Sequence, residues 1–91
     1  MKSIMPTEKG TCYLCGRVCD TELHHIFGNR NRKLSDKDGL TVYLCHRCHW
    51  RVHNGSESAA LRYRLHVEGQ EKYEETHTRE EFRARYGRNY L

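Results

Sequence analysis

The sequence predicts a small α+β domain in which two strands and a helix gather around four cysteines, with further helices toward the C-terminus. The chain has 91 residues and is only 36% hydrophobic, so its core is small, and such small cores often need an additional stabilising element. Two Cys-x-x-Cys pairs can provide one by binding a metal ion. Short β-branched and aromatic runs, followed by segments with helical patterns, predict the mixed secondary structure.

The N-terminal half is expected to contain a tight turn and both strands. The turn is Cys12-Tyr-Leu-Cys15-Gly16, in which Gly16 is free to take a left-handed conformation. Residues 22–27 and, more clearly, residues 40–44 have the composition of strands. The polar and basic residues 28–39 between them are interpreted mainly as loop.

Helical patterns begin after Cys45, and the first helix is expected to end at Asn54-Gly55. Ser56 is expected to cap a second helix over about residues 57–74. Thr78 and Glu81 form a capping box for a short last helix that ends near Gly87. The residues expected to pack against the rest of the domain are Leu61, Leu65 and Tyr73 in the second helix, and Phe82, Tyr86, Tyr90 and Leu91 in and after the last one.

The domain organisation follows from these elements. Residues 1–10 are interpreted as a loose leader, residues 11–55 as the metal-stabilised core, and residues 56–91 as a helical extension that packs on the core. We find no apolar run suited to a signal peptide or a membrane span. The chain is therefore expected to be cytoplasmic, where thiols stay reduced and Cys-x-x-Cys pairs favour metal over disulfide.

Positive charge is concentrated in the cysteine-rich half. Residues 1–53 carry nine Lys/Arg against five Asp/Glu, whereas residues 54–91 carry seven of each, for a net charge of +4. A charge balance of this kind fits nucleic acid as a partner. Because mildly basic small domains are common, charge alone does not indicate a function, and the functional assignment depends on the specific motifs.

Four cysteines are interpreted as ligands of one structural zinc ion. Cys12 and Cys15 form one pair and Cys45 and Cys48 the other, and each pair places two thiolates on one tight turn. A shell filled by four thiolates has no open position, so this ion is expected to hold the fold and to do no chemistry. The alternatives are buried thiols and a disulfide, and Cys19 is left over as a free thiol or an exchangeable ligand.

A second metal site is predicted from histidines. His49 and His53 are four residues apart, so both project from one face of a helix. His24 and His25 are neighbours on a strand and point to different sides, so only one of them is expected to join the helical pair. The other is free to act as a base. Three protein ligands with an open position are typical of a catalytic metal site.

These motifs resemble the HNH endonucleases, in particular the subset with four zinc-binding cysteines beside the catalytic site. The resemblance rests on "ELHHI" and "LCHRCHWRVH" and covers residues 12–53, and the longer text with "FRARYGRNYL" is similar to small phage and prophage HNH proteins and to RecA-dependent nucleases. It implies the ββα-metal fold and hydrolysis of DNA to 5′-phosphate and 3′-hydroxyl ends in a bacterial host cell.

The resemblance also implies a role for each histidine. His24, His49 and His53 are expected to bind a catalytic divalent ion, which could be Mg²⁺, Mn²⁺, Ni²⁺ or Zn²⁺, and His25 is expected to be the general base. The asparagine that usually orients the base in the family has no counterpart here, so Asp38 or a backbone carbonyl is expected to take its place.

DNA contacts are expected from basic side chains that would bind phosphates without reading sequence. Trp50 is expected to pack rather than to stack on bases, and His66 and His77 receive no role. The alternatives to a nuclease are a zinc-stabilised DNA-binding module without catalysis and an accessory protein active only with a phage packaging or recombination partner. The residues expected to contact DNA are Arg30, Arg32, Lys33, Arg47 and Arg51.

Overall fold

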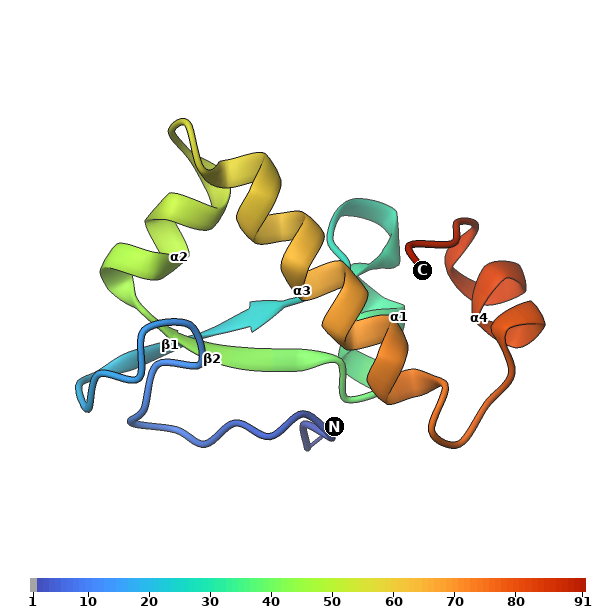
Figure 1. Ribbon diagram of the computed structural model, residues 1–91. Helices are drawn as coiled ribbons and strands as arrows, with labels where there is room; N and C mark the ends of the chain where they lie inside the picture. Colours follow the sequence, from blue (N-terminus) through green and yellow to red (C-terminus); the bar gives the residue numbers. More distant parts are fainter. Residues whose placement is uncertain (1) are drawn as a thin grey trace.

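The computed structural model describes residues 2–91 and shows the α+β architecture that the sequence predicts. Two antiparallel strands, β1 (Thr21–His25) and β2 (Thr41–Cys45), form the sheet. Helices α2 (His46–His53) and α3 (Ser58–Tyr73) follow β2 directly and lie over one side of the sheet (Figure 1). The remaining helices are η1 (Asn29–Asn31), α1 (Arg32–Lys37) and α4 (Arg79–Tyr86).

The strand register decides which histidine faces the helices. In β1, His24 pairs with Val42 of β2, and both side chains are buried, whereas Leu23 is exposed. Consecutive side chains of a strand diverge, so His25 does not follow His24 beneath α2. It instead meets Asp36 of α1.

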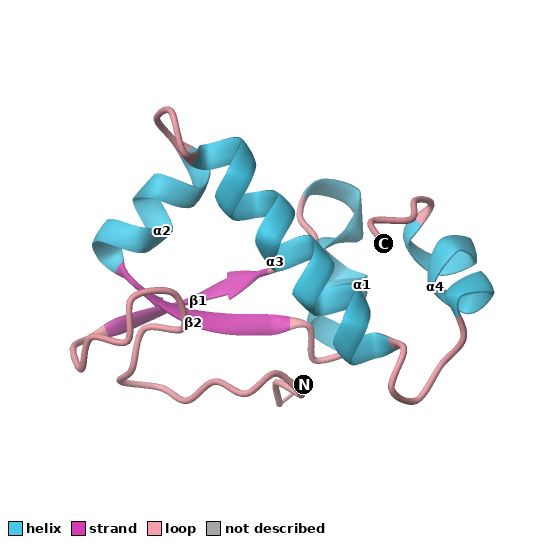
Figure 2. Cartoon of the chain, viewed as in Figure 1, coloured by secondary structure: helices cyan, strands magenta, loops and turns pink. Residues whose placement is uncertain are grey.

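The segment between the strands is helical rather than the predicted loop. It forms η1 and the six-residue helix α1, which are drawn as short coils between the strands in Figure 2. A helix this short is not stable by itself, but Ser35, which is fully buried, ties it to the residues that follow β1 and precede β2. Its hydroxyl accepts a hydrogen bond from the Phe27 amide at 3.2 Å and donates one to the Leu40 carbonyl at 2.6 Å.

The predicted loose leader is packed in its described part, while Met1 lies outside the described residues. The backbone amide of Ile4 donates to the Gly39 carbonyl at 2.8 Å, and Met5 is buried in the core. Gly39 has φ +73°, and a Cβ there would lie 2.6 Å from the Lys2 carbonyl. The N-terminal segment therefore approaches the start of β2 so closely that only glycine fits there.

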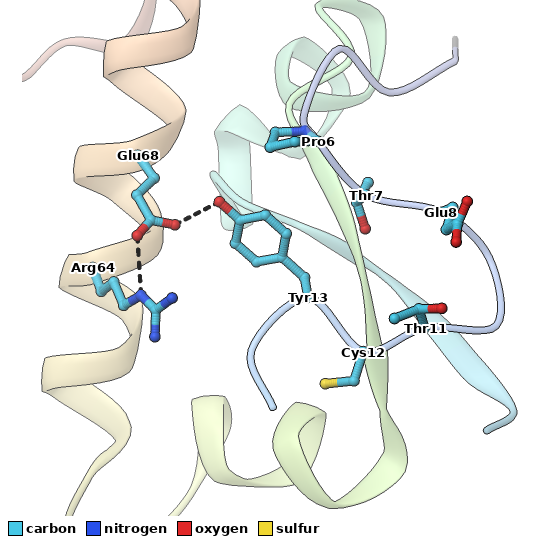
Figure 3. A pocket seen from close by; sticks show the side chains of 8 residues that line it. All are labelled: Pro6, Thr7, Glu8, Thr11, Cys12, Tyr13, Arg64 and Glu68. Carbon is cyan, nitrogen blue, oxygen red and sulfur yellow. Dashed lines mark hydrogen bonds and ion pairs between the residues drawn. The ribbon is translucent and has the colours of Figure 1, made fainter. Parts of the chain in front are cut away.

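A hydrogen-bond chain joins the first cysteine turn to α3. Tyr13 lies between Cys12 and Cys15 and donates from its hydroxyl to Glu68 Oε1 at 2.6 Å, and Arg64 Nε donates to Glu68 Oε2 at 3.0 Å (Figure 3). Burial and the Glu68 carboxylate both raise the pKa of Tyr13, so its hydroxyl remains a donor. This contact holds the cysteine turn against the long helix.

The C-terminal helices complete the core. Phe82 and Leu65 are fully buried, and the predicted capping box of Thr78 and Glu81 and the left-handed Gly87 (φ 79°) are both present. Asp38 fastens α4 because its carboxylate accepts hydrogen bonds from the Arg85 guanidinium at 2.6 and 2.9 Å and from the Tyr86 hydroxyl at 2.6 Å.

Three sequence-based expectations for this half of the chain were wrong. The side chain of Ser56 does not cap α3, whose N-cap residue is Glu57. Leu91 is 41% exposed, although Tyr86 and Tyr90 pack as expected. Trp50 is 57% exposed rather than packed, because the apolar side of α2 that meets the sheet is formed by Cys48 and Val52.

None of the helices within residues 2–91 has the length and apolar character needed to cross a membrane.

Candidate functional site

The four cysteines of the two Cys-x-x-Cys pairs come together at one end of the sheet. Cys12 and Cys15 lie in the N-terminal turn, Cys45 ends β2 and caps α2, and Cys48 lies in the first turn of α2. Their Sγ atoms all lie within 4.8 Å of one another. All five cysteines of the chain are free thiols, which excludes the disulfide alternative in this structure. The cluster has the donor set and spacing of a structural zinc site.

The electrostatics of this cluster favour a cation at its centre. Burial raises the pKa of Cys12, but backbone hydrogen bonds near Cys15 and Cys45 outweigh that effect and lower its pKa to about 6. Burial and hydrogen bonds from neighbouring thiols raise the pKa of Cys48 to about 12. Four thiolates therefore cannot ionise together without a counter-charge, and a divalent ion supplies that charge and binds the thiolate form.

Cys19 does not belong to the cluster. It is partly buried, and its thiol lies 3.8 Å from the Arg17 carbonyl. Burial, followed by the nearby cysteines, raises the pKa of its thiol. Of the two alternatives left open by the sequence, the structure shows a free thiol outside the four-cysteine set.

The three histidines predicted to bind a second metal also come together. His24 projects from β1 toward α2, where His49 and His53 lie one turn apart, and their donor nitrogens are all within 4.8 Å of one another. The three ring centroids are 5.2 to 5.3 Å apart. His24 is buried, His49 is partly buried and His53 is exposed, so the cluster is open on one side. This set of imidazoles fits a transition-metal ion with free positions for other ligands.

A carboxylate that was not predicted orients one of these histidines. Glu22 lies two residues before His24 on β1, and its carboxylate accepts hydrogen bonds from His49 Nδ1 at 2.7 Å and from His46 Nδ1 at 3.1 Å. With Nδ1 donating to Glu22, Nε2 of His49 is left as the atom that can bind a metal. His46 is exposed, as predicted. The i, i+2 spacing of Glu22 and His24 on one strand was the available sequence signal.

Burial favours the neutral, metal-binding form of two of the three clustered histidines, His24 and His53. Burial, followed by the neighbouring histidines, lowers the pKa of His24 to about 3. The pKa of His53 is also lowered, by burial first and then by His49 and Arg62. Protons therefore compete weakly with a metal ion for these two side chains.

His25 lies beside the cluster and is held by Asp36 instead of the expected Asp38. Its Nε2 donates to Asp36 Oδ1 at 3.1 Å, and this hydrogen bond is the first cause of the lowered pKa of Asp36. Asp38 faces α4 and is engaged by Arg85 and Tyr86. The prediction failed because it assumed a loop, whereas α1 turns Asp36 toward β1. With Nε2 protonated, Nδ1 of His25 is left as a proton acceptor.

The basic residues predicted to contact DNA divide between two surfaces. Arg32 and Lys33 line an open hollow with His25 and Asp36, and Arg32 also lines the cavity over the three histidines. Arg47 and Arg51 lie instead around a hollow at the end of α2, beside the exposed Trp50. There, Arg51 forms an ion pair with Glu57 at 2.8 Å. Arg30 is exposed in η1.

Helix α3 contributes two residues to the site that received no role from the sequence. Arg62 and His66 line a cavity of about 230 Å³ together with His24, His25 and His53. The two residues are four apart on a helix and so share a face, which is the sequence signal that could have identified them. Only the fold shows that this face lies against the histidine cluster.

None of the family models, curated proteins or solved structures with which the chain was compared matches it.

Proposed function

We propose that this protein is a metal-dependent HNH endonuclease that hydrolyses DNA to 5′-phosphate and 3′-hydroxyl ends. The observation that carries the proposal is the arrangement of four histidines. Three of them gather their donor nitrogens within 4.8 Å, and the fourth, His25, lies beside them and is held by a carboxylate. A metal-binding domain without catalysis has no need of a fourth, oriented imidazole at this place.

The three-histidine cluster would hold the catalytic divalent ion, and the four cysteines would hold a structural zinc ion. When bound, the catalytic ion supplies positive charge that stabilises the scissile phosphate and the leaving 3′ oxygen. Histidine ligands admit Zn²⁺, Ni²⁺, Mn²⁺ and Mg²⁺, with carboxylate and water as the donors that the last two prefer.

The chain's own residues would prepare water for attack and position the strand. His25 would accept a proton from water at Nδ1, while Asp36 holds the opposite side of the ring and stabilises the imidazolium that forms. Arg32 and Lys33 lie next to His25 and would bind phosphate oxygens of the DNA backbone. Because such contacts do not read bases, the proposal predicts cleavage with little sequence preference.

The ββα-metal arrangement belongs to the same proposal. It is supported by the order of elements, in which the base and one ligand lie at the end of β1, β2 returns beside it, and α2 carries the other two ligands. The cysteine cluster joins the end of β2 to α2 and would hold these elements in place. A bacterial cytoplasm and a phage or prophage origin fit this proposal.

A plasmid-nicking assay tests the proposal. Protein that retains its tightly bound zinc is supplied with Mg²⁺, Mn²⁺, Ni²⁺ or Zn²⁺, and the wild type is compared with His25→Ala and with His77→Ala, a histidine near α4 that serves as the matched control. We expect nicking with at least one ion, its loss in His25→Ala and its retention in His77→Ala. Nicking that survives in His25→Ala would contradict the role of His25.

The second candidate function is a zinc-stabilised DNA-binding module, including an accessory role with a phage packaging or recombination partner. The basic half of the chain, and the position of Arg32 and Lys33 beside His25, favour DNA binding in either case. Gel-shift binding to plasmid DNA without nicking by any metal ion would favour this second function.

A further inference from the structure

Two adjoining cavities share the histidine site. Both are lined by His24, His25 and His53, together with the backbone turn after β1. One cavity extends toward Arg32 of α1 and the other toward Arg62 of α3. We call the two cavities together the trough: they share the histidines of the proposed catalytic centre, and Arg32 lines one of them and Arg62 the other.

Arg62 has its charge available for a ligand. Its Nε donates a long hydrogen bond of 3.4 Å to the Ser58 carbonyl, and within residues 2–91 it forms no ion pair with a carboxylate. Arg64, two residues further along, is different. It points about 200° away around the helix and is paired with Glu68 at 3.0 Å, as Figure 3 shows.

The side chain of His66, which lines the same cavity as Arg62, is held in place by aromatic contacts. The His66 ring stacks on Phe27, with ring centroids 5.1 Å apart and an interplanar angle of 13°, and it also contacts Tyr90 at 4.6 Å. Phe27 is buried in the core. Of these rings, His66 lines the cavity, one helical turn from Arg62. Its contacts with Phe27 and Tyr90 hold it in place, so it does not have to be ordered when a ligand binds.

An unpaired guanidinium beside a site for phosphodiester chemistry is suited to a phosphate, because its planar donors match two phosphate oxygens. We infer that Arg62 binds a backbone phosphate of the nucleic acid strand on the side of the histidine site away from Arg32. The strand then crosses the trough from Arg32 over His25 to Arg62. This inference rests on the proposed function, since it takes the substrate strand to lie over the histidines.

The test is equilibrium binding of a fluorescein-labelled DNA duplex, measured by anisotropy at several salt concentrations without added divalent ion. The variants are Arg62→Ala, Arg62→Lys and the matched control Arg64→Ala, which removes the same charge from the same helix on the other face. Zinc content and melting temperature establish that each variant is folded. Gel analysis after each titration establishes that the DNA is intact.

We expect Arg62→Ala to bind roughly tenfold more weakly and to lower the slope of log K against log salt by about 0.9, the value for one phosphate contact. Arg62→Lys keeps the slope but loses the two-point contact, and Arg64→Ala matches the wild type. Equal affinity and slope in Arg62→Ala and Arg64→Ala would overturn the inference, and so would a wild type that does not bind DNA. If the wild type binds DNA through Arg62 but nicks no plasmid, the inference about Arg62 stands and the proposed nuclease activity is contradicted.

Discussion

The hydrogen bond between Asp36 and His25 can be tested by replacing Asp36 with alanine. A hydrogen bond to a charged group is stronger than one between neutral groups. The Asp36 side chain is 49% exposed and that of His25 is 15% exposed, so water competes for the contact and weakens it. We therefore expect Asp36→Ala to lower kcat by about tenfold, the effect of losing one weak hydrogen bond to the imidazolium.

The assay is cleavage of a labelled duplex under saturating DNA, with kcat and KM measured separately. Asp36→Ala also removes a negative charge next to the DNA, so its KM should not rise, and the loss should appear in kcat. Asp36→Asn keeps an acceptor for His25 Nε2 and should fall between the wild type and the alanine variant. Glu80→Ala, which removes an exposed carboxylate of α4, controls for net charge. A kcat for Asp36→Ala within twofold of the wild type would refute the reasoning.

The remaining predictions concern stability. Cys45→Ser should leave the chain largely unfolded. Structural zinc contributes roughly 10–16 kcal/mol to folding, which is more than the net stability of a typical domain, about 5–15 kcal/mol. A zinc assay and circular dichroism check this, with Cys19→Ser as the unaffected control. Asp38→Ala should lower the free energy of unfolding in urea by about 2–3 kcal/mol, because two α4 side chains lose a charged partner; a change below about 0.5 kcal/mol would contradict this. His24 has a folded pKa of about 3 and an unfolded one of about 6.5, so the unfolded state binds more protons between these values. The free energy of unfolding should therefore fall as the pH drops below 6.5, by about 2 kcal/mol at pH 5. A His24→Gln variant whose stability has the same pH dependence as the wild type would contradict this prediction.

Local spacing was enough to predict the candidate ligands. Two residues between paired cysteines, and three between His49 and His53, place their donor atoms together in any tight turn or helix. The capping box at Thr78 depends on backbone geometry within one turn, and it is present as predicted. The strands were predicted because their β-branched and aromatic residues form a buried, pleated surface.

The errors concern contacts between segments that are distant in the sequence. The region around Ser35 has the composition of a loop, but it becomes helical because hydrogen bonds to Phe27, just after β1, and Leu40, just before β2, stabilise it. That helix decides that Asp36 rather than Asp38 meets His25, and the docking of α4 decides what Asp38 does instead. Trp50 is exposed because Cys48 and Val52, rather than Trp50, form the side of α2 that packs against the sheet.

The sequence by itself thus identified the candidate metal ligands, because ligand pairs are local features with fixed spacing. Only the tertiary structure decided which groups orient and surround them. Glu22 reaches His49 across 27 residues, and Arg62 reaches the histidine cavity from a helix that begins after the core motif ends. Such contacts depend on the packing of α2 and α3 over the sheet, and that packing is a property of the whole chain that no short pattern contains.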